Sequence, residues 1–235
     1  MKSQLLNKTD YRRGFKAGLI AAGTLVPIFV GFGILAVQKG LSPALALITT
    51  VIVFASPAQY LIADMIGSSA AVWQFIITGI LMNTRFFIMS LTMSHFMRHV
   101  PLKKVLPLAH FVAATPFLLT LFDKRKNKDA DFFSYFCGVA SAVFPATLLG
   151  TVLGFIVYED LPPILLFASS LFLPVYFSIL IASDVKKKLE IIVVVSCFMA
   201  APFAEVLAPG WGVVLAALIS ATVAVGIKAW MQRAG

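Results

Sequence analysis

Arg85 is the side chain whose position most needs a chemical explanation. It is the only Asp, Glu, Lys or Arg between Met65 and Phe96, and it lies about 14 residues into an apolar segment at 71–96. At 1.5 Å rise per residue this is roughly 20 Å along a helix, a depth at which an arginine in a bilayer costs ~2.5–3.5 kcal/mol. Two interpretations stay open. Arg85 is either a structural arginine that donates to carbonyls freed at a helix break, or a residue that lines a substrate pathway together with Asn83.

The stretch from Ser56 through Pro57 to Gln59 is a second candidate site. Proline removes an N–H group and clashes with the carbonyl four residues back, so it kinks or breaks a helix, and Ser56 and Gln59 offer partners for the freed backbone groups. A full break also exposes a helix N-terminus, which suits a carboxylate. A simple kink and a binding break both stay open here. Pro174 and Tyr176 are the predicted counterparts in the second half of the chain.

Four further ionisable residues lie in or near apolar segments. A proton-coupled transporter needs a group that titrates between two faces, and histidine is suited by its ordinary pKa. His110 and Glu205 are therefore the predicted proton-coupling residues, whereas His95 and Asp64 fall near predicted segment ends and are expected at the membrane interface.

Signatures of enzymes are missing from the sequence. It holds no His-Glu-x-x-His, no phosphate-binding glycine loop and no Gly-x-Ser-x-Gly. Cys137 and Cys197 lie inside apolar segments, where cysteine usually serves as a small buried hydrophobe. The sequence therefore predicts a protein that is not an enzyme, without a cofactor or metal site.

The elements that position these residues are predicted to be membrane helices. The chain has 235 residues, of which 60% are hydrophobic and 12% charged, and roughly 25% charged is usual for a soluble domain. Five windows contain no charged residue: 17–38, 40–63, 132–158, 161–183 and 206–227. Each exceeds the ~20 residues that a helix needs to cross a bilayer, and backbone polar groups facing lipid must be paired within a helix. The predicted fold class is an all-α polytopic integral membrane protein.

Eight apolar segments follow a basic N-terminal segment at 1–16, which is expected to be cytoplasmic. They cover approximately 17–38, 43–64, 71–96, 107–122, 132–157, 161–183, 189–207 and 211–230, and together they predict one transmembrane domain at 17–235. Segment 43–64 contains Pro57, and segment 107–122 contains Pro107, His110 and Pro116. At least one of the two is expected to be broken or re-entrant, so the predicted number of spans is six to eight.

The net charge of +9 fits membrane topology better than nucleic-acid binding, because lysine and arginine lie almost wholly in the short connections, as the positive-inside rule requires. The residues predicted to be cytoplasmic are Lys124, Arg125, Lys126 and Lys128 in one loop, Lys186, Lys187 and Lys188 in another, and Lys228 and Arg233 at the C-terminus. Glu159 and Asp160 are expected on the outer face, and both termini inside. One loop, with Arg98, Lys103 and Lys104, would lie outside if all eight segments crossed.

The spacing of prolines suggests an internal repeat. Pro27 and Pro145 are 118 residues apart (145 − 27), and Pro57 and Pro174 are 117 apart (174 − 57). The predicted halves are 17–122 and 132–230. Many transporters consist of two related halves around a central site, so a repeat would favour transport.

Four motifs taken in order resemble a known family. They are Pro27-x-x-x-Gly31-Phe32-Gly33, Val53-Phe54-Ala55-Ser56-Pro57-Ala58-Gln59-Tyr60, Met82-Asn83-Thr84-Arg85 and Leu173-Pro174-x-x-Phe177. Across the whole chain the pattern is similar to the AzlC/YgaZ branched-chain amino-acid exporters. The resemblance implies the large permease subunit of a bacterial inner-membrane exporter of neutral amino acids, driven by the proton gradient and paired with a small AzlD-like membrane subunit. A membrane scaffold or assembly subunit and a channel are the alternatives.

Overall fold

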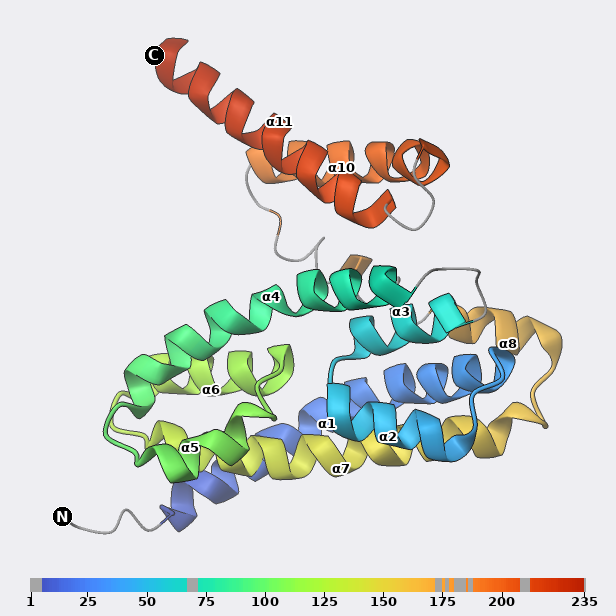
Figure 1. Ribbon diagram of the computed structural model, residues 1–235. Coiled ribbons are helices and arrows are strands. Elements are labelled where there is room, and N and C mark those ends of the chain that lie inside the picture. The colour runs from blue at the N-terminus through green and yellow to red at the C-terminus, as the bar shows by residue number, and fades with distance from the viewer. Residues whose placement is uncertain are drawn as a thin grey trace. The chain divides into compact units, whose positions relative to one another are not determined.

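The computed structural model describes residues 6–66, 72–171, 175, 178–179, 185, 188–207 and 212–234, and within these ranges it contains helices and no strand (Figure 1). This agrees with the predicted all-α polytopic membrane protein. The chain forms two compact units. The first comprises Met1–Ser69 with Gly79–Leu173, and the second Ala70–Thr78 with Pro174–Gly235.

Helices α1 (Lys8–Gln38) and α7 (Phe132–Tyr158) form the centre of the first unit. Both are long and apolar enough to cross a membrane, as is Leu189–Leu207 in the second unit, and these are the three such helices in the described ranges. The side chain of Asn7 caps α1, and that of Asp131 caps α7, so each helix begins with a side-chain acceptor for its first N–H groups. Residues 8–16, which were predicted as a separate segment, continue directly into the first span.

Glycines bring α1 and α7 into backbone contact. A Cβ atom added to Gly33 would lie within 3.0 Å of Thr151 and Gly154, and one added to Gly154 within 3.0 Å of Val30 and Gly33. Near the other end of the pair, Gly138 approaches the carbonyl of Tyr11 in the same way. The start of α1 contacts the start of α7 and the later parts of the two helices contact each other, so the two helices run parallel. Small residues allow such approach in membrane helices.

The segment predicted at 43–64 is a hairpin of two short helices. Helix α2 (Pro43–Val53) ends at Phe54, which has the left-handed angles φ 44° and ψ 37°, and α3 (Ser56–Ile66) begins two residues later. Pro57 lies in the first turn of α3, where a missing N–H costs nothing. The chain therefore breaks just before Pro57.

Side-chain contacts show that the chain reverses at this break. Gln59 Nε2 donates to Thr50 Oγ1 at 2.8 Å, although nine residues of continuous helix would separate the two by about 13.5 Å. The next residue, Tyr60, donates its hydroxyl proton to the carbonyl of Ile28 at 2.6 Å. Helices α2 and α3 thus enter and leave at the same end of the first unit, as Figure 1 shows.

The segment predicted at 107–122 is a second hairpin, entering from the opposite end. Helix α4 (Val72–Met97) leads to α5 (Leu102–Ala109), and α6 (Ala114–Lys126) follows a break at 110–113. One apolar cluster contains Met97, Val100 and Phe117 together with Phe132 and Phe136 at the start of α7. Both arms of this hairpin therefore pack at the end where α7 begins.

A polar cluster holds this end together. Arg13 of α1 forms ion pairs with Asp10 at 2.8 Å and with Asp123 of α6. Asp10 also accepts from the backbone N–H of Asp131 at 2.9 Å, and the backbone N–H of Asn7 donates to Ser134 Oγ at 2.8 Å. The cluster links the start of α1, the end of α6 and the start of α7.

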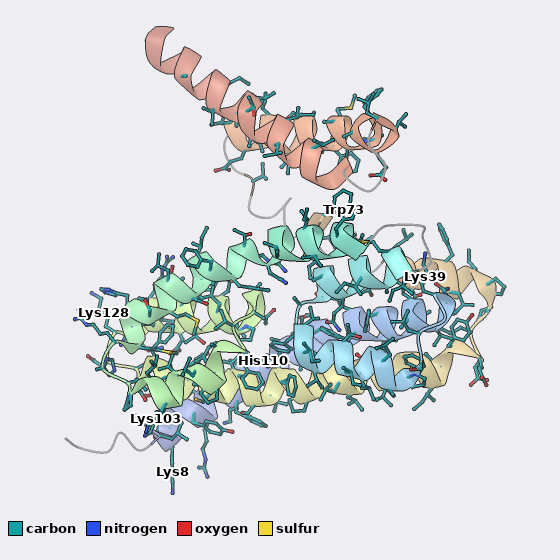
Figure 2. All side chains as sticks on the ribbon, in the orientation of Figure 1. Lys8, Lys39, Trp73, Lys103, His110 and Lys128 are labelled. Carbon is teal, nitrogen blue, oxygen red and sulfur yellow. The ribbon has the colours of Figure 1, made fainter. Side chains whose placement is uncertain are left out.

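The two hairpins account for the basic loop that did not fit the predicted topology. Because neither hairpin crosses the unit, the connection with Arg98 and Lys103 lies at the same end as the start of α1. Figure 2 shows Lys8, Lys103 and Lys128 gathered at that end and Lys39 at the other. The conflict arose from counting both hairpins as full spans.

Cysteine labelling tests this arrangement. In a background without Cys137 and Cys197, Lys103→Cys and Lys128→Cys are expected to react with an impermeant maleimide from the same side of the membrane, and Lys39→Cys from the other side. The physical reason is that a hairpin returns the chain to the side it came from. Labelling of Lys103→Cys and Lys128→Cys from opposite sides would show that α5–α6 crosses the membrane.

Two further packing relations concern the predicted repeat. Helix α8 (Pro163–Ser170) packs against α1, and α2 packs against α7, so the helix that follows each long helix covers the other one. Both α2 and α8 begin with a proline in the first turn. This reciprocal packing of α2 on α7 and α8 on α1 agrees with two related halves, and the repeat itself stays a prediction.

In the second unit α10 (Lys188–Leu207) and α11 (Gly212–Ala234) pack together. Glu205 Oε2 accepts a hydrogen bond from the backbone N–H of Gly212 at 2.9 Å. A carboxylate at this place favours the N-terminus of α11.

Candidate functional site at the hairpin tips

The tips of the two hairpins meet against the middle of α7. The ring of Phe54, which is 4% exposed, lies 5.4 Å from that of Phe144, 6.0 Å from that of Phe111 and 6.3 Å from that of His110, between centroids. Phe144 directly precedes Pro145, and His110 and Phe111 form the break between α5 and α6. Both breaks and the proline of α7 therefore share one level of the first unit, with an aromatic cluster between them.

The α2–α3 tip brings two helix ends of opposite polarity together. The last carbonyls of α2 and the first N–H groups of α3 have no partner within their own helices, and they carry partial negative and positive charge respectively. Gln59 makes the first helical bond of α3, to the carbonyl of Ala55 at 3.0 Å. Among the described residues, no backbone carbonyl accepts from the N–H groups of Ser56 and Ala58 outside the helix.

The α5–α6 tip exposes a similar helix start. Ala113 occupies the position before α6 and makes no side-chain capping bond, and Pro116 lies in the first turn. His110 follows the last residue of α5. Its side chain is exposed and contacts the ring of Phe54 in the aromatic cluster. His110 is labelled at the centre of the first unit in Figure 2.

Gln59 lies in a buried polar cluster one turn beyond the α2–α3 tip. Gln59, Thr50 and Thr151 are each 0% exposed. Gln59 Nε2 donates to Thr50 Oγ1 at 2.8 Å, and Thr50 Oγ1 lies 3.1 Å from Thr151 Oγ1 of α7. Gln59 Oε1 has no hydrogen-bond partner among the described residues. Buried polar atoms without a partner are rare in proteins.

Arg85 and Asn83 lie on α4, away from its basic end. Arg85 precedes Met97 by 12 residues (97 − 85), about 18 Å along the helix. Its guanidinium carbon is 5.0 Å from the ring centroid of Phe86. In the described part of the chain Arg85 Nε and Asn83 Oδ1 are buried and make no hydrogen bond. The contacts described for these two residues do not join them to Gln59 or to the tips.

The other predicted site residues are distributed over both units. Ser56 and Pro57 form the first turn of α3, half-buried at the tip. Glu205 belongs to the second unit, where it binds the start of α11. Pro174 and Tyr176 lie outside the described residues.

The structure adds Thr50, Thr151, Phe111 and Phe144 to the candidate site. A threonine in a charge-free window is a weak signal, because its hydroxyl is often satisfied by the carbonyl four residues back. Thr50 does bond the carbonyl of Ala46 in this way, at 3.0 Å. Only the fold shows that Thr50 also meets Gln59 and Thr151.

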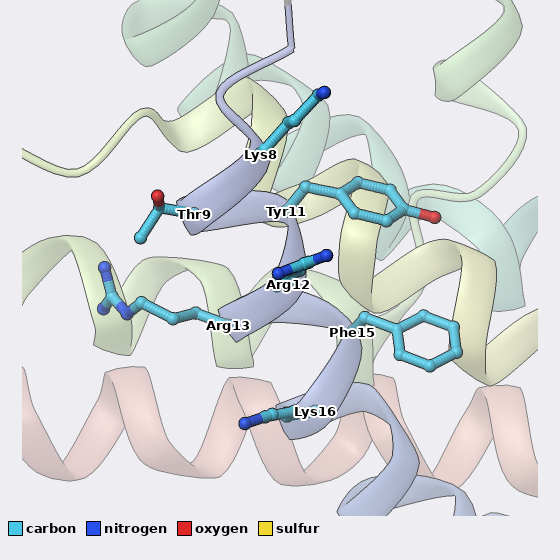
Figure 3. Close-up of a pocket in the computed structure, with 7 residues that line it drawn as sticks. All are labelled: Lys8, Thr9, Tyr11, Arg12, Arg13, Phe15 and Lys16. Carbon is cyan, nitrogen blue, oxygen red and sulfur yellow. The ribbon is translucent and has the colours of Figure 1, made fainter.

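A separate hollow of about 790 Å³ lies at the start of α1 (Figure 3). Its lining includes Lys8, Arg12 and Lys16, and the rings of Tyr11 and Phe15 are stacked beside each other with centroids 6.4 Å apart. It opens on the basic end of the first unit, whereas the hairpin tips lie near the middle of α7.

Comparison with known families gives one result, and comparisons with curated proteins and with solved structures give no match. A model of the AzlC protein family matches residues 20–161, more than half of the chain. The matched region contains both hairpins, their tips, Gln59 and Arg85. The chain thus belongs to the AzlC family, a transporter-type family of membrane proteins related to branched-chain amino-acid transport.

Proposed function

We propose that this protein is the large subunit of a secondary exporter that moves branched-chain or other neutral amino acids across the bacterial cytoplasmic membrane. Its family supports a role in amino-acid transport. The observation that carries the proposal is the α2–α3 hairpin, which ends in a broken tip beside the middle of α7. Irregular backbone at membrane depth is stable only in protein surroundings or along a cavity, and transporters place substrates at such breaks.

The tip suits a zwitterion in particular. An amino acid carries a carboxylate and an ammonium group on one carbon, and the tip offers a helix N-terminus beside a helix C-terminus. In this proposal the N–H groups of Ser56 and Ala58 hold the carboxylate, and the partial negative charge of the end of α2 faces the ammonium group. An aliphatic side chain is accepted by an apolar wall that includes Phe54 and Phe86.

Arg85 has a second role in the proposal, as a fixed positive charge along the pathway. Its Nε is buried and has no partner among the described residues, which is costly for a charged group. Arg85 and Asn83 would meet the substrate carboxylate as it enters or leaves the tip. Pro174 and Tyr176 would act in the corresponding part of the second half.

The proposed orientation places the basic end of the first unit in the cytoplasm. Lys8, Arg12 and Lys16 border the hollow at this end (Figure 3), and basic residues near a cytoplasmic leaflet are attracted to its anionic lipids. Proton coupling would involve His110 at the α5–α6 tip and Glu205 in the second unit. A small AzlD-like membrane subunit is the proposed partner.

Export of leucine from cells loaded with a leucine-containing dipeptide tests the function. Arg85→Ala, at wild-type expression, is expected to lower the export rate about tenfold or more, because a charged contact worth roughly 1.5–3 kcal/mol is lost. The matched control is Arg125→Ala, which removes an arginine from the basic end and is expected to export normally.

The results separate the site from the function. Normal export by Arg85→Ala would remove Arg85 from the pathway and leave the transporter in place. Absence of export by the wild type, with its small partner present and for valine, leucine, isoleucine and methionine alike, would favour a scaffold or assembly subunit. Export that continues at the same rate after the proton gradient is collapsed would contradict proton coupling.

A further inference from the structure

The side-chain amide of Gln59 has one end without a hydrogen-bond partner among the described residues. As placed, Nε2 donates to Thr50 Oγ1 and Oε1 has no partner in the described part of the chain. With the amide turned over, Oε1 would need the hydroxyl proton of Thr50, which lies 3.0 Å from the carbonyl of Ala46 and donates to it. An amide has two donors and one carbonyl acceptor, and Thr50 satisfies only the donor side of it.

The neighbouring hydroxyl protons favour the orientation in which Oε1 is open. Thr50 Oγ1 lies 3.0 Å from the carbonyl of Ala46, and Thr151 Oγ1 lies 3.1 Å from the carbonyl of Thr147. When both hydroxyls donate to their own helices, Thr50 keeps a lone pair that accepts from Gln59 Nε2. Gln59 Oε1 is then an acceptor without a donor among the residues that the structure describes.

The electrostatics of this place favour a donor that carries positive charge. Thr50 belongs to the last turn of α2, where the unpaired carbonyls give partial negative charge. The cluster of Gln59, Thr50 and Thr151 has a hydroxyl or amide on each residue and no charged side chain of its own. A bound cationic group would find an acceptor in a region that already favours it.

We propose that Gln59 Oε1 accepts a hydrogen bond from the α-ammonium group of the transported amino acid, in a site formed by Gln59, Thr50 and Thr151 between α2, α3 and α7. This inference rests on the proposed function and deepens it, because it assigns the recognition of the amino group to one atom. Thr50 is a positioning residue, since it fixes the amide through Nε2.

The site is closed in the structure. Gln59 is 0% exposed, and the tip that precedes it is packed against Phe144, Phe111 and His110 through Phe54. The ligand reaches Gln59 when the α2–α3 tip moves away from the aromatic cluster. A buried water is the other occupant that would satisfy Oε1, and the experiment separates it from the substrate.

The test uses the purified protein with its small partner and three probes of similar shape: leucine, isoamylamine, which lacks the carboxylate, and 4-methylpentanoate, which lacks the amino group. Binding is measured by isothermal titration. The wild type is expected to bind leucine and isoamylamine, and to bind 4-methylpentanoate about tenfold or more weakly than leucine, because the hydrogen bond to a charged donor is missing.

Substitutions then identify the atom. Gln59→Glu retains an acceptor and is expected to bind isoamylamine more tightly than the wild type, whereas Gln59→Leu is expected to lose about tenfold or more in leucine affinity. Thr50→Val is expected to weaken leucine binding, and Thr50→Ser to restore it. If Gln59→Leu does not fold, the binding of isoamylamine by Gln59→Glu still tests the proposal.

Three outcomes would overturn the site. The first is that Gln59→Leu binds leucine as tightly as the wild type does, which is the result expected if a water alone occupies the site. The second is equal binding of leucine and 4-methylpentanoate by the wild type, and the third is weaker binding of isoamylamine by Gln59→Glu than by the wild type. If loaded cells still export leucine in these cases, only the assignment of Gln59 fails. If the wild type neither exports nor binds any of the amino acids, the proposed function fails together with it.

Discussion

Gly154→Leu is expected to prevent α1 and α7 from packing and to leave little folded protein. A Cβ atom at Gly154 would lie within 3.0 Å of the carbonyl of Val30, the Cα of Gly33 and the N of Ile34. These are backbone atoms, which do not move aside as the end of a flexible side chain does. Overpacking costs about 1–3 kcal/mol in ordinary cores and occasionally more, and a backbone clash along two rigid helices belongs to the upper end of that range.

Gly23→Leu is the matched control. It lies on α1 as well, and a Cβ atom at Gly23 meets nothing within 4 Å, so the variant is expected to fold normally and to gain slightly in helix propensity. The measurement is the fraction of monodisperse protein in detergent and its melting temperature. Equal melting temperatures for Gly154→Leu and the wild type would show that α1 and α7 are not in backbone contact.

The helices of this fold follow from the sequence because lipid permits few alternatives. The charge-free windows at 17–38 and 132–158 correspond to most of α1 and α7. Prolines also predicted that at least one of the segments 43–64 and 107–122 is broken or re-entrant. The structure breaks both, and Pro57 and Pro116 each lie in the first turn of a new helix.

The reversal at each break was not predictable in the same way. A proline shows where a helix stops, but the direction of the next helix depends on Phe54 in its left-handed conformation and on contacts such as that between Tyr60 and Ile28. The basic residues Arg98 and Lys103 were the sequence signal for these reversals, because a topology in which every segment crosses places them on the side of the membrane that the positive-inside rule disfavours.

The candidate site was predictable where its chemistry is local. Gln59 stood out beside Pro57 because both disturb an apolar segment, and the structure places it in a buried polar cluster. Thr151 and Phe144 belong to α7, about 90 residues away in the sequence, so no spacing rule brings them to the break. Arg85 stood out by its charge alone, and its guanidinium lies against the ring of Phe86.

Phe54→Ala is expected to make the exporter leak, because the ring of Phe54 fills the space between the two hairpin tips. It contacts the rings of Phe144, Phe111 and His110, and no other residue of the α2–α3 break contributes a ring to this cluster in the described part of the chain. With the ring removed, the outward leucine gradient that loaded cells maintain is expected to fall about tenfold, the effect of roughly 1.4 kcal/mol.

Phe54→Gly separates the ring from the backbone. Phe54 has φ 44°, a conformation that costs an ordinary residue roughly 1–2 kcal/mol and glycine almost nothing. Both variants are expected to leak equally, and the glycine variant is expected to melt at a higher temperature than the alanine variant. Phe87→Ala is the control, since this phenylalanine is 71% exposed on α4.

The comparison distinguishes a barrier from a structural contact. A gradient as steep as that of the wild type in Phe54→Ala would show that another part of the protein closes the pathway. A leak in Phe54→Ala that Phe54→Gly repairs would assign the defect to backbone strain and not to the missing ring. If both variants leak and only Phe54→Gly is as stable as the wild type, Phe54 has two roles: its ring blocks the pathway, and its backbone stores strain at the tip. Movement of the tip would then release this strain as it opens the route to Gln59.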